Sequence, residues 1–285
     1  MSIEEKKVKS LFEEGHYYHP LPDFKKMNEQ FYEKNKTKHL FDVNLNPETQ
    51  QYLITEFVKY YKELPPWQDG KSAGLDYYFA TDNNMYQYGD AISLYSMIRQ
   101  YKPQRIIEIG SGHSTAVMSD VNRLYFENKI NITCIEPYCD RIKNVLGANI
   151  AHVHLHEHNL QDVPVAMFKE LKENDILFVD SSHTSKFGSD LNKIIFEILP
   201  LLDKGVVIHF HDIFQNFEYP YEWLKMGIGW NEAYLLHAFL MYNTHFQILL
   251  HSSYVHSHFA DLMKEHLPLT LKNMGASLWI QKTTL

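Results

Sequence analysis

The feature that most constrains the fold is a regular alternation of short apolar segments and helix-like segments that begins near Gly89. The apolar segments, which we expect to be strands, cover residues 105–109, 131–135, 152–156, 175–179, 205–210, 246–250 and 277–281. Helical patterns lie between most of them, at residues 90–101, 114–127, 141–146, 165–172, 190–202 and 231–242. Strands separated by helices of about 10–15 residues form βαβ units and a parallel sheet. The sequence therefore predicts a Rossmann-like α/β fold, with a doubly wound, mostly parallel seven-stranded sheet and an antiparallel last strand.

The first 85 residues have a different character. They are polar, rich in Tyr, Phe and Lys, and interrupted by prolines at residues 20, 22, 65 and 66. Apolar side chains recur at helical spacing over residues 48–63, and the proline pair ends that pattern. We expect a helical cap or arm over residues 1–85 and the sheet domain over residues 86–285.

Composition excludes several classes of protein. Lys plus Arg number 27 and Asp plus Glu number 35, so the formal charge of 27 − 35 = −8 disfavours a nucleic-acid partner. No segment approaches the ~18 uninterrupted apolar residues of a membrane span, and the charged start of the chain lacks the apolar core of a secretory signal. Cys134 and Cys139 form neither a zinc motif nor a disulfide framework. These features predict a cytoplasmic protein with two reduced thiols.

A glycine-rich turn follows the first strand. It contains Gly110 and Gly112, where glycine lets a ligand approach the backbone and the next helix presents its N–H groups. A dinucleotide-binding motif would carry a third glycine at the position of Thr115, which disfavours an NAD-dependent oxidoreductase. The carboxylate of Glu108, two residues before the turn, suits a cationic ligand. Glu136, at the end of the second strand, is placed to accept both hydroxyls of a ribose.

Together, Glu108-x-Gly110-x-Gly112, Glu136 and Asp180 resemble the class I S-adenosylmethionine-dependent methyltransferases. The stretch from about residue 86 to 246 resembles more specifically a bacterial-type group associated with O-methylation of sugars and surface glycans. The matching segments are residues 105–114 (RIIEIGSGHS), 179–183 (VDSSH), 209–214 (HFHDIF) and 230–236 (WNEAYLL), and residues 17–23 (YYHPLPD) resemble an N-terminal motif of that group.

The resemblance implies a set of residues that bind S-adenosyl-L-methionine. In it, the glycine turn lines the methionine and ribose part, residues 159–162 border the adenine, and residues 88–90 close over the methionine end. The predicted cofactor-binding residues are Tyr88, Asp90, Glu108, Gly110, Ser111, Gly112, Ser114, Glu136, Asn159 and Asp180.

Histidines and aspartates gather where the fourth and fifth strands end. Asp180 and His183 follow the fourth strand, and His209, His211 and Asp212 follow or end the fifth. Because the ends of adjacent parallel strands share one edge, Asp180 and Asp212 are expected to meet, and with His211 they predict a site for a divalent metal such as Mg²⁺ or Mn²⁺. The metal-free alternative is a general base, for which His183 and His211 are the candidates beside Asp180.

An aromatic loop at residues 217–230 follows the fifth strand, and its rings suit the faces of a sugar. We expect the acceptor between this loop and the N-terminal segment around His19, with His19, Tyr219, Trp223 and Trp230 as the substrate residues. The alternative is a hydrophobic clamp that holds the N-terminal arm. The histidines at 152–158 and at 251, 256 and 258 are expected to have no chemical role.

The sequence therefore predicts an S-adenosylmethionine-dependent O-methyltransferase that acts on a saccharide or sugar-linked hydroxyl, with possible assistance from a divalent metal. The competing hypotheses are an N-methyltransferase of another small metabolite and a non-catalytic cofactor-binding or scaffold protein with the same fold. We expect a small-molecule or glycan acceptor, and a homo-oligomer is compatible with the sequence.

Overall fold

The computed structural model describes residues 10–67 and 77–284. Residues 1–9, which belong to the segment predicted to lack a secretory signal, lie outside the described residues. A seven-stranded sheet forms the centre of the protein, with the order β3-β2-β1-β4-β5-β7-β6. The strands are β1 (Arg105–Ile109), β2 (Asn131–Ile135), β3 (His154–His156), β4 (Ile176–Val179), β5 (Val207–Phe210), β6 (Phe246–His251) and β7 (Leu278–Lys282). Strands β1 to β5 are parallel, and β7 is antiparallel to both β5 and β6. The predicted fold is confirmed.

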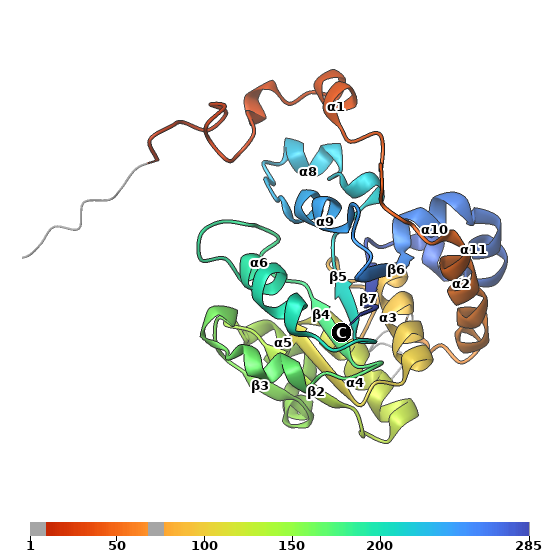
Figure 1. Ribbon diagram of the computed structural model, residues 1–285. Coiled ribbons are helices and arrows are strands. Elements are labelled where there is room, and N and C mark those ends of the chain that lie inside the picture. Colours follow the sequence, from red (N-terminus) through yellow and green to blue (C-terminus); the bar gives the residue numbers. More distant parts are fainter. Residues whose placement is uncertain (1–9, 68–76, 285) are drawn as a thin grey trace, which may run out of the picture.

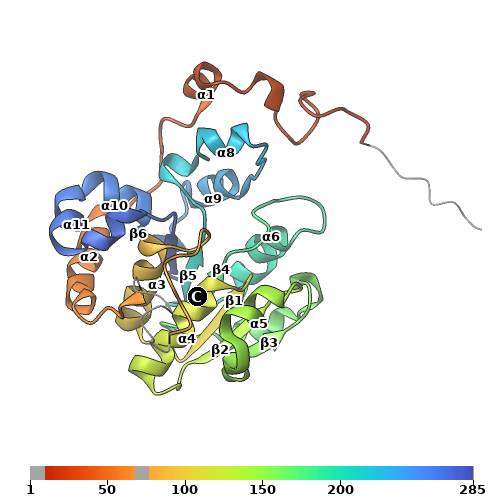
Figure 2. The same ribbon diagram turned by 180° about the vertical axis from the view of Figure 1, so that it is seen from behind.

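Helices cover both faces of this sheet (Figures 1 and 2). One face carries α2 (Pro47–Tyr61), α3 (Tyr88–Tyr101), α4 (His113–Phe126), α5 (Asp140–Leu146), α10 (Ser252–His258) and α11 (Ala260–His266). The other carries α6 (Asp190–Lys193), α7 (Leu199–Leu201), α8 (Tyr221–Lys225) and α9 (Glu232–Leu240). The short helix α1 (Glu29–Asn35) belongs to the N-terminal arm, defined here as residues 10–46, which passes over α8.

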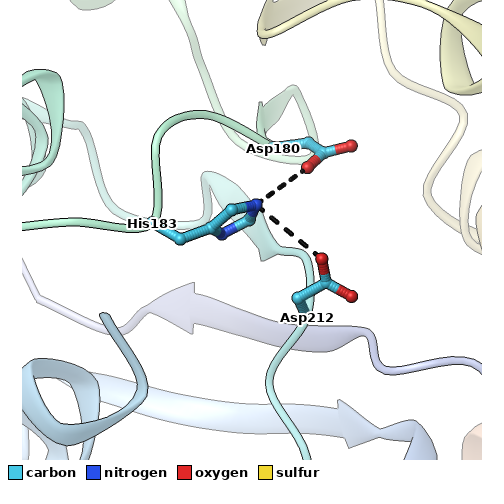
Figure 3. A group of neighbouring side chains, drawn as sticks. All are labelled: Asp180, His183 and Asp212. Atoms are coloured by element: carbon cyan, nitrogen blue, oxygen red, sulfur yellow. Dashed lines mark ion pairs between the residues drawn. The ribbon is translucent and has the colours of Figure 1, made fainter. Parts of the chain in front are cut away.

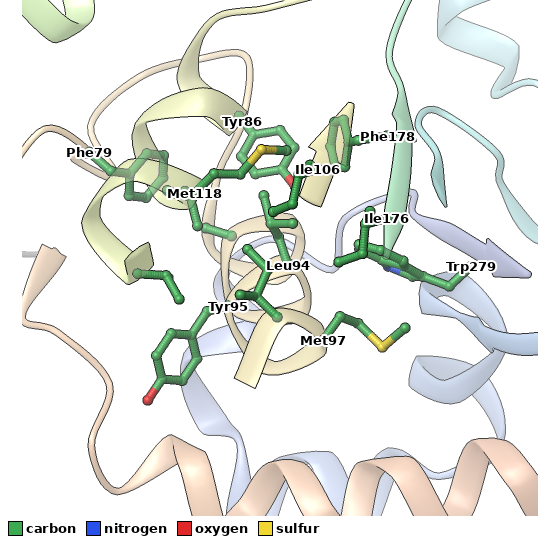
Figure 4. Close-up of a cluster of buried hydrophobic side chains, with 14 of the residues drawn as sticks. Phe79, Tyr86, Leu94, Tyr95, Met97, Ile106, Met118, Ile176, Phe178 and Trp279 are labelled. Carbon is green, nitrogen blue, oxygen red and sulfur yellow. The ribbon is translucent and has the colours of Figure 1, made fainter. Parts of the chain in front are cut away.

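The two cores follow from the alternation of side chains along each strand. Ile106 and Phe178 face the α3 side, where they pack with Leu94 and Trp279 (Figure 4). Their neighbours Ile107 and Leu177 belong to the core on the other side. All four residues of β4 and of β5 are buried, as expected for strands covered on both faces.

Some helices differ from the prediction. Residues 165–170 form a 3₁₀ helix (Val165–Glu170) rather than an α-helix, and the helix expected over residues 190–202 contains a π-helical turn (Ile194–Ile198). That turn lies just before Pro200, which has no N–H to donate to an α-helical ladder. Helices α10 and α11 were not predicted, because their mixed polar and aromatic sequence lacks a clear apolar stripe.

The predicted cap is only partly a separate layer. Leu53, Ile54 and Phe57 of α2 are at most 2% exposed and belong to the same core as β1 and β4. The arm before α2 lies instead against the segment around α8. The boundary at residue 85 stays a prediction, whereas α2 packs as an integral part of the sheet domain.

Candidate active site

The glycine turn lies where the chain order of the sheet reverses, between β1 and β4. In open α/β sheets this switch point forms the ligand-binding crevice. Gly110 has φ +82°, and a Cβ atom there would lie 1.8 Å from the carbonyl oxygen of Asp180. Only glycine combines this backbone conformation with so close an approach.

A cavity of ≈ 880 Å³, the glycine-turn cavity, opens along this crevice. Most of the predicted cofactor residues line it: Gly110, Ser111, Gly112, Ser114, Glu136, Asn159 and Asp180. The Glu136 carboxylate accepts the Ser111 N–H at 3.1 Å through Oε2 and the Tyr138 N–H at 2.7 Å through Oε1. These two bonds fix an acceptor group beside the turn, at the position predicted for a ribose contact.

Glu108 does not face this cavity, which corrects the prediction of a direct ligand contact. It is fully buried and accepts hydrogen bonds of 2.6 Å from the Ser114 and Thr115 hydroxyls. Burial raises its pKa to about 7. Its carboxylate therefore holds the start of α4 against the end of β1 and shapes the turn from below.

The predicted pair Tyr88 and Asp90 also lies outside the glycine-turn cavity. The Tyr88 ring is on the far side of α3, where the Lys272 ammonium lies 4.8 Å from its centroid. Asp90 is buried and accepts hydrogen bonds from the Ala276 N–H and the Ser277 hydroxyl. Tyr86, which the sequence did not single out, lines the cavity instead.

At the ends of β4 and β5, Asp180, His183 and Asp212 converge (Figure 3). The His183 Nε2 atom lies 3.4 Å from Asp180 Oδ1 and 3.8 Å from Asp212 Oδ2. His183 and Asp212 have φ of +55° and +59°, left-handed conformations that are uncommon away from glycine and recur at functional sites. Within the described part of the chain, these three residues form the one group whose ligand atoms lie within 4.8 Å of one another. The predicted third ligand was His211; this group contains His183 in its place.

Glu232, which sequence reasoning missed, fixes His183. The His183 Nδ1 atom lies 2.7 Å from Glu232 Oε2, and the carbonyl oxygen of His183 accepts the N–H groups of Asn231 and Glu232. The Trp230 ring covers the imidazole at a centroid distance of 4.2 Å. The only sequence signal was an acidic residue in the first turn of a predicted helix, 49 positions away.

His211 lies among three carboxylates. Its Nε2 atom is 3.6 Å from Asp90, and its Nδ1 atom is 3.4 Å from Asp212 and 3.7 Å from Asp180. Although burial opposes the charged form, these carboxylates raise the pKa of His211 well above its ordinary value. In the same way Asp180 and Glu232 outweigh burial and raise the pKa of His183 to about 10. Without a cation in the site, both rings therefore carry a proton at neutral pH.

His209 is a core residue, which corrects its placement with the reactive groups. It is fully buried, its ring stacks on Phe178 at 3.9 Å, and its Nε2 atom lies 3.1 Å from the Ser277 hydroxyl. Burial and the nearby His211 lower its pKa well below the usual value. The strand's alternation points this ring into the α3-side core rather than toward the crevice.

A second cavity of ≈ 630 Å³, the arm cavity, adjoins the first. The two share Asn84, Met85, His211, Asp212 and Trp223. The rest of the arm cavity is lined by the N-terminal arm, the segment after β5 and the loop before β7, through residues such as Tyr32, Lys36, Thr37, Gln215, Glu218, Asn273 and Gly275. His211 and Asp212 thus face both cavities.

Two of the four predicted substrate residues line a cavity and two do not. Trp223 lines both cavities and Trp230 lines the glycine-turn cavity. Tyr219 is fully buried, and its hydroxyl accepts the Ala233 N–H at 3.0 Å, so it is a core residue and not a wall of the site. His19 lines none of the described cavities; its Nδ1 atom accepts the N–H of Leu21, whose side chain approaches Gly229. The arm does reach the aromatic loop, but through other residues.

The sheet order and the cavity at its switch point define a Rossmann-like cofactor-binding fold of the methyltransferase kind. Residues 107–213 match the family model described as a methyltransferase domain. This match confirms the predicted enzyme class, an S-adenosylmethionine-dependent methyltransferase, for the segment that carries β1 to β5.

Whole-chain similarities are more distant. An uncharacterized protein of Archaeoglobus fulgidus is 29% identical over 189 residues, which cover 64% of this chain and 85% of that protein. The Podospora anserina methyltransferase PaMTH1, bound to SAH, is 17% identical with a TM-score of 0.45, over 89% of this chain and 93% of that one. The O-methyltransferase TomG of Streptomyces achromogenes, in complex with SAM, is 12% identical with a TM-score of 0.46, over 92% and 99% of the two chains. Separately, no helix among the described residues is long and apolar enough to cross a membrane.

Proposed function

We propose that this protein transfers the methyl group of S-adenosyl-L-methionine to a hydroxyl oxygen of a saccharide or sugar-linked small molecule. The observation that carries the proposal is that two cavities meet at His211 and Asp212. One cavity has the glycine turn and acidic strand end of a nucleoside-binding crevice. The other offers a separate space for an acceptor on the opposite side of the same two side chains.

For the cofactor, the glycine-turn cavity supports the predicted orientation. Glu136 would accept the ribose hydroxyls, and Asn159, beside Gln161, would border the adenine. The methionine end would then lie toward Asp180 and the wall shared with the arm cavity. This orientation brings the sulfonium methyl next to the acceptor, the positioning on which an in-line transfer depends.

For the acceptor, the lining of the arm cavity supports a polyhydroxylated ring. Amide and hydroxyl side chains capable of both donating and accepting hydrogen bonds contribute: Gln215, Asn216, Ser253, Ser257 and Asn273. Trp223 and Tyr32 add aromatic surface for the apolar face of such a ring. Pockets of this kind bind by apolar contact and orient by a few polar groups.

A divalent cation such as Mg²⁺ or Mn²⁺ fits the group formed by Asp180, His183 and Asp212. Two carboxylates and one imidazole are suitable donors, and Glu232 holds the His183 ring through Nδ1 so that Nε2 faces the two aspartates. Such a carboxylate partner is typical of metal-binding histidines. The cation would supply Lewis-acid polarisation of the acceptor hydroxyl.

The acceptor hydroxyl also needs a general base, and His211 and Asp90 are the groups that could provide it. The hydroxyl must lose its proton as the C–S bond breaks and the C–O bond forms, and His211 is the base we favour, with Asp90 holding the opposite nitrogen. The carboxylates around His211 raise its pKa well above the ordinary value, which disfavours the neutral ring. A cation held by Asp180 and Asp212 would offset part of that negative charge, and this supports the metal-assisted form of the reaction over the metal-free one.

Calorimetry with S-adenosylmethionine and with NAD tests the cofactor, and binding of NAD alone would overturn the proposal. Transfer of labelled methyl groups to a glycan extract tests the acceptor. Full activity in excess chelator would rule out the metal while leaving the methyltransferase in place. A protein that binds the cofactor but labels no hydroxyl in the extract would contradict O-methylation of saccharides.

A further inference from the structure

A third cavity continues the arm cavity away from the transfer point. This distal cavity has a volume of ≈ 390 Å³ and shares Gln215 and Asn216 with the arm cavity. Its volume by itself falls in the range of about 300–1,000 Å³ that small-molecule sites occupy. The two cavities therefore adjoin at Gln215 and Asn216, and together they are called the cleft below.

One continuous stretch of the N-terminal arm forms a wall along both cavities. Tyr32, Lys36 and Thr37 line the arm cavity, and residues 38–41 and Leu45 line the distal cavity. The stretch is tied to the domain on each side: the Tyr32 hydroxyl donates to the carbonyl oxygen of Tyr219 at 3.0 Å, and the N–H of Thr37 donates to Glu218 at 3.0 Å. Further on, the N–H of Tyr242 donates to the carbonyl oxygen of Asp42 at 3.1 Å. These hydrogen bonds hold the arm against the domain along the cleft.

Aromatic rings gather at the distal end of this cleft. His39 and Phe41 lie on the arm with their centroids 5.2 Å apart, and Tyr254 stacks on His258 of α10 at 4.0 Å. Phe41 is 68% exposed. Exposed aromatic faces that line a cavity are binding surface rather than core. One aromatic pair lies on the N-terminal arm and the other on α10. A sugar ring bound between the arm and α10 would therefore contact both pairs.

The charges of the two cavities differ. The arm cavity is lined by three carboxylates (Asp90, Asp212 and Glu218) and by Lys36, whereas the described residues around the distal cavity include Lys38 and no carboxylate. Complementarity therefore favours a neutral or acidic group at the distal end and disfavours a cationic one.

We propose that the acceptor is an oligosaccharide or glycan chain of at least two linked rings, whose reacting ring occupies the arm cavity and whose next ring, neutral or acidic, lies in the distal cavity between Phe41 and Tyr254. The proposal rests on the proposed function and adds the length of the acceptor. A free monosaccharide would leave the distal cavity without a partner.

The test uses the full chain, labelled S-adenosylmethionine and a partial hydrolysate of surface glycan separated by size into one-ring and longer fractions. The variant Phe41→Ala removes distal aromatic surface, and Phe196→Ala is its matched control, because Phe196 is 62% exposed and lines none of the described cavities. Phe41→Ala should raise KM for the longer acceptors about tenfold, which corresponds to ~1.4 kcal/mol. Its kcat and its cofactor affinity should match those of the wild type and of Phe196→Ala.

Equal kcat/KM for one-ring and longer acceptors, with no effect of Phe41→Ala, would overturn the two-ring acceptor and leave the methyltransferase intact. A lack of label in every fraction, with the cofactor bound, would overturn the saccharide acceptor and this proposal together.

Discussion

The glycine-turn cavity and the arm cavity lie on either side of His211 and Asp212, yet they are built differently. The first is lined mainly by the residues that directly follow β1, β2, β3 and β4, such as Gly110, Glu136 and Asn159. The second is assembled from segments far apart in sequence, including residues 32–37, 211–223 and 273–276. The lining of the glycine-turn cavity is thus set by the order of the strands, whereas the lining of the arm cavity depends on how distant segments pack against one another.

The largest effect is expected on the cofactor side. Gly110→Ala should destabilise the protein by at least ~3 kcal/mol and abolish cofactor binding, because the new Cβ atom would meet the Asp180 carbonyl oxygen in a left-handed conformation. Thermal unfolding and calorimetry measure both effects. Gly227→Ala is the control, because Gly227 has φ +86°, its Cβ would meet no described atom within 4 Å, and it lines none of the described cavities. Equal effects of both variants would contradict the role assigned to the strand contact.

Asp212→Asn should lower turnover without weakening the binding of S-adenosylmethionine. Because the amide lacks the carboxylate that a divalent cation would bind, we expect kcat to fall about 100-fold. The Kd for S-adenosylmethionine should stay within about threefold, since a small change in affinity is worth less than ~1 kcal/mol. Asp203→Asn, at an exposed aspartate paired with Lys172, is the control. Unchanged turnover in Asp212→Asn would remove this residue from the mechanism.

A buried histidine makes the acceptor side sensitive to acid. Burial lowers the pKa of His251 to about 4, so its folded-state pKa lies below the unfolded value of ~6.5. The stability that this neutral ring contributes is present above ~6.5 and is lost as the pH falls through 4. We expect a loss of ~3 kcal/mol over that window, and a weaker pH dependence in His251→Phe. Urea unfolding at several pH values measures this, and identical pH profiles for both proteins would contradict it.

The smallest effect concerns the arm. Tyr32→Phe removes the hydroxyl that donates to the carbonyl oxygen of Tyr219, a bond worth ~1 kcal/mol. The KM for the acceptor should rise about fivefold, without a change in cofactor affinity. Tyr52→Phe, at an exposed position of α2, is the control. A loss of cofactor affinity in Tyr32→Phe would mean that the two cavities are not separable.

The histidines at the ends of β4 and β5 show which site residues could be predicted from the sequence and which could not. The sequence placed His183 and His211 at the strand ends because the apolar runs before them are unambiguous, and the structure brings both beside Asp180 and Asp212. It could not tell that His209, two residues earlier on the same strand, turns into the core against Phe178 and Trp279. Both rings lie on the same face of β5, as the two-residue period requires. His209 is inside the strand and is covered by the core, whereas His211 lies past the strand end, where the two cavities open.

The sequence by itself determined the succession of strands and helices along the chain, the position of the glycine turn and the acid that follows β2, because short apolar runs, glycines and helix periods are local signals. The tertiary structure alone decided that Glu232 holds His183 from 49 residues away. It also decided that Glu108 lies beneath the turn rather than in the cavity, and that the arm closes the acceptor side through Tyr32 and Thr37 instead of His19. These contacts join segments whose relative placement depends on the packing of the whole sheet, which no local pattern encodes.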